Sequence, residues 1–222
     1  MKLAEERRET LARMRLYVIT GDHGDEVETA RIVEAALDGG ATVIQLRKKS
    51  MPMPEQYRLA LALRTLTSQH EALLIINDHA DLAIAADADG VHLGQDDLPT
   101  DVVRALPGFK GRLIGRSTHS LEQARAAIDA GADYIAVGPV YPTPTKVGRP
   151  AVGTGLVVAV AAIADRPFVA VGGIDHDNAP DLVEAGAPAI AVVRAVYDAV
   201  DPAEAARRLH ELIVTRLEGA HQ

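Results

Sequence analysis

The stretch AAIDAGADYIAV, residues 126–137, decides the fold class of this chain, because it joins a helix to a strand through a glycine. Gly131 stands where a helix ends on a residue of positive φ, and the apolar run YIAV after it is typical of a buried strand. The same order recurs as LVEAGAPAIAVV at residues 182–193. A helical segment over about 25–38 likewise stops at Gly39 and Gly40 before TVIQLR. A repeated β/α unit is the simplest cause of this recurrence.

Apolar runs along the whole chain give eight strands that alternate with helical segments. The strands are expected at residues 16–20, 42–47, 72–77, 90–93, 112–117, 134–138, 168–172 and 189–194. Further helices are expected near residues 54–70, 79–86, 100–106, 120–130, 154–164, 177–185 and 202–217. This order predicts an α/β fold, a (β/α)8 TIM barrel over residues 16–218 with an extra N-terminal helix within 1–15. The alternative is a doubly wound sheet, whose G-x-G-x-x-G turn is not matched by GDHGD after the first strand.

Charge, length and cysteine content restrict the class of protein. The 222 residues carry a formal net charge of −8, which argues against a nucleic-acid partner but permits a small basic pocket for a phosphorylated metabolite. No apolar run reaches the roughly 20 residues that cross a bilayer, so we expect no membrane association. The absence of Cys favours a cytoplasmic location. One domain over residues 1–222 is expected, and the oligomeric state is left open, a homo-oligomer included.

Cations follow the second expected strand, at the end where TIM barrels carry their active sites. Gln45, Arg47 and Lys49 are alternate residues, so they share one direction if the strand pattern persists. An amide and two cations that converge in this way suit a pyrophosphate group. The alternative is a solvated basic strand end.

Carboxylates follow the next two strands. Asn77 and Asp78 end the third apolar run, and Asp96 and Asp97 end the motif GVHLGQDD. Carboxylates with few His or Cys nearby suit Mg²⁺, which completes its shell with water and substrate phosphate. Zinc is a poor fit, because no H-E-x-x-H pair is present and the histidines suit hydrogen-bonded loop or strand-end positions better. Asp96 is either a ligand or a neighbour of one.

Hydroxyls and glycines supply a second set of anion-binding groups. Ser117 and Thr118 close the fifth strand, where they bond a phosphate or prepare the next helix. Gly172 and Gly173 follow the seventh strand, the recurrent phosphate position of TIM barrels. The loop GPVYPTPTK, residues 138–146, adds hydroxyls and the cation Lys146, unless it is an ordinary surface loop. Two anion sites predict two phosphorylated substrates.

These motifs together resemble thiamine phosphate synthases. The motifs QLRKK, IINDH, GVHLGQDDLP, GRSTHS, GPVYPTPTK, AVGGI and AVVRA occur in the order and rough spacing of that family, from about residue 16 to 196. The resemblance implies a TIM-barrel transferase of thiamine biosynthesis. It would join 4-amino-2-methyl-5-hydroxymethylpyrimidine diphosphate to 4-methyl-5-(2-hydroxyethyl)thiazole phosphate, with Mg²⁺-assisted, dissociative loss of pyrophosphate.

The resemblance also implies roles for individual residues. The pyrimidine diphosphate would be held by Gln45, Arg47, Lys49, Asn77, Ser117 and Lys146, of which Arg47, Lys49, Ser117 and Lys146 would be catalytic. Mg²⁺ would be held by Asp78 and Asp97. The thiazole phosphate would be held by Thr143, Pro144, Thr145, Gly173, Val193 and Arg194, the last two through backbone N–H groups.

Two positions depart from the family pattern. Arg194 stands where a small Ser is often found, and it adds a side-chain contact to phosphate. Lys48 stands where an acidic residue is frequent, and we expect it to face outward. The alternatives are a thiazole tautomerase-like barrel, which needs only the thiazole phosphate site, and a non-catalytic phosphate-binding regulator on the same fold.

Overall fold

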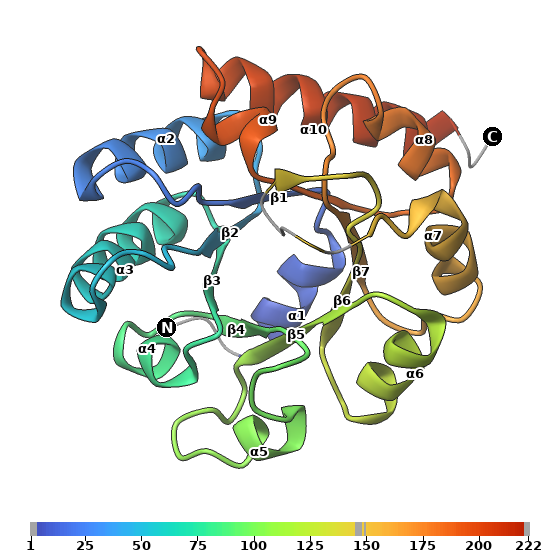
Figure 1. Cartoon of the computed structure of the whole chain (residues 1–222). Coiled ribbons are helices and arrows are strands. Elements are labelled where there is room, and N and C mark those ends of the chain that lie inside the picture. Colours follow the sequence, from blue (N-terminus) through green and yellow to red (C-terminus); the bar gives the residue numbers. More distant parts are fainter. Residues whose placement is uncertain (1–3, 145–147, 149, 220–222) are drawn as a thin grey trace.

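Eight parallel strands close into a barrel in chain order, as Figure 1 shows. The computed structural model describes residues 4–144, 148 and 150–219. Tyr17 pairs with Ala191, so the first and last strands meet and the sheet has no open edge. The prediction of a (β/α)8 TIM barrel is confirmed. The strands are β1 Leu16–Ile19, β2 Val43–Leu46, β3 Leu73–Asn77, β4 Gly90–Leu93, β5 Leu113–Thr118, β6 Tyr134–Val137, β7 Phe168–Val171 and β8 Ile190–Val192.

Helices surround the barrel on its outer side (Figure 1). They are α2 Glu26–Asp38, α3 Met53–Gln69, α4 Ala80–Ala85, α5 Thr100–Arg104, α6 Leu121–Asp129, α7 Gly153–Ala161, α8 Ala179–Glu184, α9 Arg194–Tyr197 and α10 Pro202–Gly219. Helix α1 Ala4–Ala12 lies instead at one end of the barrel. Of the helices described, α9 alone was not expected. The last strand was predicted to run to Arg194, but it ends at Val192 and Arg194 begins α9. Among the described residues, no helix is both long and apolar enough to cross a membrane.

Glycines end the helices as the sequence predicted. Gly131 and Gly186 have φ of +78° and +93°, and each follows a helix directly before a strand. The cap of α6 differs from the expectation, because Ser120, and neither Ser117 nor Thr118, accepts the hydrogen bond from Gln123 N. The hydroxyl of Thr118 instead donates to Ala136 O in the barrel wall, at 3.1 Å.

The apolar core has two layers. The larger one lies between the sheet and the surrounding helices. The smaller one fills the barrel interior, where Tyr17 and Tyr134 pack with small and branched side chains, and Leu11 and Met14 reach it from the N-terminal segment. Helix α1 therefore lies against the N-terminal end of the barrel, behind the strands in Figure 1.

Buried ion pairs fasten α1 in this place. Asp89 is fully buried and bonds Arg7 Nε at 3.0 Å, Arg64 Nη1 at 2.6 Å and the backbone N–H of Leu74. Arg7 also donates to Gly111 O at 3.0 Å. These contacts close the N-terminal end of the barrel and leave the C-terminal end as its mouth.

Candidate active site

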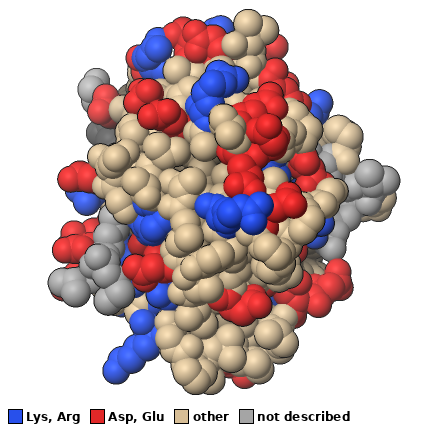
Figure 2. All heavy atoms as spheres, turned by 90° about the vertical axis from the view of Figure 1, so that its left-hand side faces the viewer, with Lys and Arg blue, Asp and Glu red and all other residues tan. Residues whose placement is uncertain are grey.

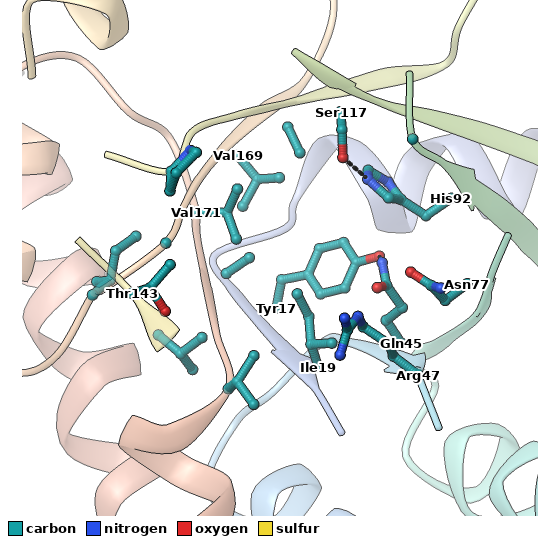
Figure 3. Close-up of a pocket in the computed structure, with 18 of the residues that line it drawn as sticks. Tyr17, Ile19, Gln45, Arg47, Asn77, His92, Ser117, Thr143, Val169 and Val171 are labelled. Atoms are coloured by element: carbon teal, nitrogen blue, oxygen red, sulfur yellow. Dashed lines mark hydrogen bonds between the residues drawn. The ribbon is translucent and has the colours of Figure 1, made fainter. Parts of the chain in front are cut away.

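A cavity of about 630 Å³ lies at the C-terminal ends of the strands. Figure 3 shows that it has two unlike halves. Polar side chains from β2 to β5 line one half: Gln45, Arg47, Asn77, His92 and Ser117. Val169 and Val171 of β7 line the other, with Thr143 beside them, and Ile19 of β1 lies next to Arg47. Ala136 of β6 and Ala191 of β8 also line the cavity. A single mouth thus offers a site for charged groups beside a site for an apolar ring.

The two cations after β2 both line the cavity, as the alternation predicted. Thr20 fixes the backbone beneath them, because its hydroxyl donates to Arg47 O at 3.0 Å and accepts from Arg47 N at 2.8 Å. Lys49 is half exposed, and its Nζ lies 3.2 Å from Asp78 Oδ2. Both cations are therefore placed at the mouth, where an anionic group can reach them.

The two proposed metal ligands line the same cavity. Asp78 has φ of +63°, a conformation that costs energy for a residue with a Cβ, and its N–H donates to His92 O at 2.9 Å. Asp97 Oδ2 accepts from Gly94 N at 2.6 Å, which orients this carboxylate. Asp96 also lines the cavity. Within the described ranges no three His, Cys, Asp or Glu side chains form a metal cage, so an ion here would complete its shell with oxygens of water or substrate.

Lys48 points away from the cavity, as expected, but it is buried rather than solvated, with 2% of its surface exposed. Its Nζ donates to the carbonyl oxygens of His23 and Gly24 and, at 2.9 Å, to the hydroxyl of Tyr197 on α9. Burial lowers the pKa of this ammonium. Lys48 thus joins the loop after β1 to α9, directly behind the cations of the mouth.

Five buried polar side chains form a continuous hydrogen-bonded chain under the cavity. Gln45 Nε2 donates to the hydroxyl of Tyr17 at 2.7 Å, and the hydroxyls of Tyr17 and Tyr134 lie 2.9 Å apart. His92 Nδ1 lies 3.1 Å from the Tyr134 hydroxyl, and its Nε2 lies 2.9 Å from Ser117 Oγ, the contact dashed in Figure 3. Burial raises the pKa of both tyrosines, so both hydroxyls keep their protons at neutral pH.

The glycines after β7 lie against the loop that follows β6. Gly172 has φ of +102°, and a Cβ there would lie 2.5 Å from the Cα of Pro139. Gly173 has φ of +67°, and a Cβ there would lie 2.7 Å from Pro142 O. The backbone of Tyr141 donates to Gly172 O at 3.0 Å. Only glycine allows this close packing of the two loops, and both glycines line the cavity.

The remaining predicted residues divide into three groups. Thr143, Val193 and Arg194 line the cavity, whereas Pro144 is exposed outside its lining. Thr145 and Lys146 lie outside the described residues. Tyr17 also lines the cavity but was not predicted to do so, because it lies within an apolar run and nothing in the sequence distinguishes it from its neighbours there.

A parallel barrel whose mouth combines cations, carboxylates and closely packed glycine loops belongs to the class of TIM-barrel enzymes that handle phosphorylated small molecules. The comparison with family patterns narrows this class. Residues 16–196 match the family described as thiamine monophosphate synthase, and the chain belongs to that family.

Individual relatives agree with this assignment. The chain is 45% identical over 204 residues to a thiamine-phosphate synthase of Mycolicibacterium vanbaalenii, across 87% of this chain and 91% of the relative. It is 46% identical over 199 residues to one of Acidothermus cellulolyticus, across 89% and 93%. The solved structure of a thiamine phosphate pyrophosphorylase from Pyrococcus furiosus matches with a TM-score of 0.85 at 36% identity, across 93% of this chain and 98% of that one.

Proposed function

We propose that this protein joins the two phosphorylated heterocycles of thiamine phosphate: the aminopyrimidine diphosphate and the hydroxyethylthiazole phosphate. The single observation that carries the proposal is the divided cavity, in which a cationic, amide-lined half and an apolar, glycine-lined half share one mouth. A transferase that joins two rings needs both of them in one space, with their reacting atoms close together.

The polar half suits the pyrimidine diphosphate. Arg47 and Lys49 reach the mouth, where their charges oppose those of a diphosphate. Gln45, Asn77 and Ser117 offer amide and hydroxyl groups deeper in the cavity, where a ring with nitrogen acceptors and an amino donor can be oriented. Lys146, which we also assign to the diphosphate, lies outside the described residues.

The apolar half suits the thiazole. Val169, Val171 and Ala191 line it with hydrocarbon, so a small sulfur-containing ring replaces water there favourably. We assign the thiazole phosphate to the backbone around Gly173 and to Val193 and Arg194, with the side chain of Thr143 beside it. Arg194 is exposed at the rim, and its guanidinium adds a charged donor where the family often has Ser.

Asp78 and Asp97 would hold Mg²⁺. Both are carboxylates, the ligand type that this ion prefers, and an ion held by two of them takes its further oxygens from water and a diphosphate. When bound, the ion would supply positive charge against the leaving diphosphate. Lys49 Nζ lies 3.2 Å from Asp78 Oδ2, so the proposed metal ligand lies next to a cation that we assign to the same diphosphate.

The reaction needs charge stabilisation more than a protein base. The bond between the pyrimidine methylene carbon and the diphosphate oxygen breaks, and its electron pair leaves with the diphosphate. The lone pair of the thiazole nitrogen then forms the new C–N bond to that carbon. Arg47 and Lys49 stabilise the charge that grows on the leaving group, and the amide and hydroxyl groups keep the pyrimidine methylene turned toward the thiazole.

The direct test is a discontinuous assay for thiamine phosphate with the purified protein, both substrates and Mg²⁺. Product that depends on both substrates supports the proposal. Binding of the thiazole phosphate with no product would favour a tautomerase-like or regulatory barrel instead. A variant with Arg47→Ala is the matched control, because it should retain the fold and lose the diphosphate contact.

Other properties stay predictions from the sequence. These are a cytoplasmic location, the absence of nucleic-acid and membrane partners, and a single domain; the oligomeric state is left open, a homo-oligomer included. Figure 2 is consistent with the expected absence of a nucleic-acid partner, because acidic and basic side chains are interspersed on the face that it shows instead of forming a continuous basic surface.

A further inference from the structure

The hydrogen-bonded chain from Gln45 to Ser117 connects two residues that we assign to the same substrate. Its five members come from five different strands, β1, β2, β4, β5 and β6, and each is at most 7% exposed. The barrel therefore holds Gln45 and Ser117, the two ends of this hydrogen-bonded chain, through buried groups that bond to one another instead of to water. Such a buried chain transmits the orientation of one hydroxyl to the next.

The barrel makes room for the middle of this chain. Gly115 on β5 pairs with Tyr134 on β6, and a Cβ at Gly115 would lie 2.1 Å from the Cζ and 2.4 Å from the hydroxyl oxygen of Tyr134. Any larger residue at this position would displace the phenol. Packing alone needs the aromatic rings and not their hydroxyls, whereas buried Gln45 and His92 need the two hydroxyls as hydrogen-bond partners.

Proton counting allows two orientations of the chain with a neutral imidazole. In the first, Tyr17 donates to Tyr134 and Tyr134 donates to His92 Nδ1, so His92 Nε2 donates to Ser117 and the Ser117 proton is available to the cavity. In the second, every one of these bonds is reversed, and the Gln45 amide is turned so that its Oε1 accepts from Tyr17; Ser117 then donates to His92 and offers only lone pairs to the cavity. All members must change together, because a mixed arrangement leaves either two buried lone pairs facing each other or a buried phenol proton without an acceptor.

We propose that His92 and Tyr134 are positioning residues that set whether Ser117 meets the pyrimidine as donor or acceptor, and that Tyr17 links this setting to Gln45. The inference rests on the proposed function, since an aminopyrimidine carries both ring acceptors and an amino donor. A chain with one orientation at a time lets Gln45 and Ser117 recognise these groups jointly. Neither Tyr134 nor His92 needs to react.

A double-mutant cycle tests this role. Tyr134→Phe should lower kcat/KM for the pyrimidine diphosphate about tenfold in the wild-type background, as expected for one lost hydrogen bond in the chain. In a Ser117→Ala background the same change should matter by less than about twofold, because the residue through which it acts is gone. Equal factors in both backgrounds would overturn the inference, since a general loss of packing is additive.

His92 offers a matched pair of variants. In His92→Gln the amide lies near the position of Nε2 and keeps a partner for Ser117, whereas in His92→Asn it lies near Nδ1 and keeps the partner for Tyr134. The Asn variant should therefore match Ser117→Ala in kcat/KM, and the Gln variant should retain more activity. The opposite ranking would contradict the inference. Thr67→Val, which removes a buried hydroxyl on α3, controls for lost stability and should leave kcat/KM unchanged.

The same cycle is repeated by calorimetry with the pyrimidine diphosphate and Mg²⁺, with the thiazole phosphate omitted. This measurement needs no turnover and includes the His92 pair, so it decides the inference even where Tyr134→Phe fails to fold. Wild-type protein that does not bind the pyrimidine diphosphate would overturn the proposed function and the inference with it. Wild-type binding with additive losses would overturn the inference alone.

Discussion

Replacing Lys48 with Met tests whether the buried ammonium holds the mouth of the barrel together. Met has a similar length and packs well in an apolar site, but it donates no hydrogen bond. The change removes all three contacts of Nζ, to the carbonyls of His23 and Gly24 and to the Tyr197 hydroxyl. Tyr197 still donates to His23 O at 3.0 Å, so Gly24 O is the acceptor most affected.

The magnitude follows from two opposing contributions. Hydrogen bonds to a charged group contribute about 1.5–3 kcal/mol each, so three give roughly 4.5–9 kcal/mol. The desolvation of the ammonium, which also lowers the pKa of Lys48, costs several kcal/mol and is relieved in the variant. The difference predicts that Lys48→Met lowers the free energy of unfolding by roughly 2–4 kcal/mol.

Urea unfolding followed by circular dichroism measures this loss as a lower midpoint at an unchanged slope. Lys110→Met is the matched control, because Lys110 is exposed and the same substitution there should change stability by at most about 0.5 kcal/mol. If the two variants unfold at the same urea concentration, the buried ammonium stabilises nothing and the argument from its three contacts is refuted.

Three further predictions concern the barrel interior, the carboxylates of the mouth and the N-terminal helix. Burial raises the pKa of Tyr17, so above about pH 10 only the unfolded chain loses this proton, and the free energy of unfolding falls as the pH rises. Tyr17→Phe should make this fall shallower by about 1.4 kcal/mol per pH unit in urea titrations at a series of pH values. An unchanged dependence on pH would count against the prediction. Asp97→Asn keeps an acceptor for Gly94 N but loses the charge, so the Mg²⁺ concentration for half-maximal activity should rise about tenfold or more. An unchanged Mg²⁺ concentration would contradict the assignment of Asp97 as a metal ligand. Arg7→Met breaks a buried ion pair and should lower the free energy of unfolding by about 2–4 kcal/mol. Arg8→Met, at an exposed pair, should lower it by at most about 1 kcal/mol. Equal losses in urea unfolding would contradict the predicted effect of burial.

Most of the barrel could be predicted from the sequence, because its signals are local. Gly131 and Gly186 mark the ends of helices by a backbone conformation that few other residues adopt. The short apolar run after each glycine therefore predicts a buried strand. Helix α9 could not be predicted, because RAVY continues the apolar run of β8 without a break and four residues carry no helical period.

The site also contains some residues that could be predicted from the sequence and others that could not. Gln45, Arg47 and Lys49 could be predicted to line the mouth from their alternation along one strand. The same alternation places Lys48 on the other side, but it does not tell that His23, Gly24 and Tyr197 gather there from distant parts of the chain. The chain of hydrogen bonds was missed because Tyr17 and Tyr134 sit in apolar strands, where their hydroxyls meet only after the barrel closes.

The docking of α1 has a consequence for the order in which the molecule assembles. A helix of nine residues is marginal in water, so α1 depends on the contacts that receive it. Its partners Asp89 and Gly111 follow Arg7 by 82 and 104 residues in the chain. Although α1 is synthesised before any strand, these two partners of Arg7 are not in place until the chain around β4 and β5 has folded. A helix that precedes every strand of the barrel in the chain is therefore among the last elements to become ordered, and its helicity indicates that the barrel has closed.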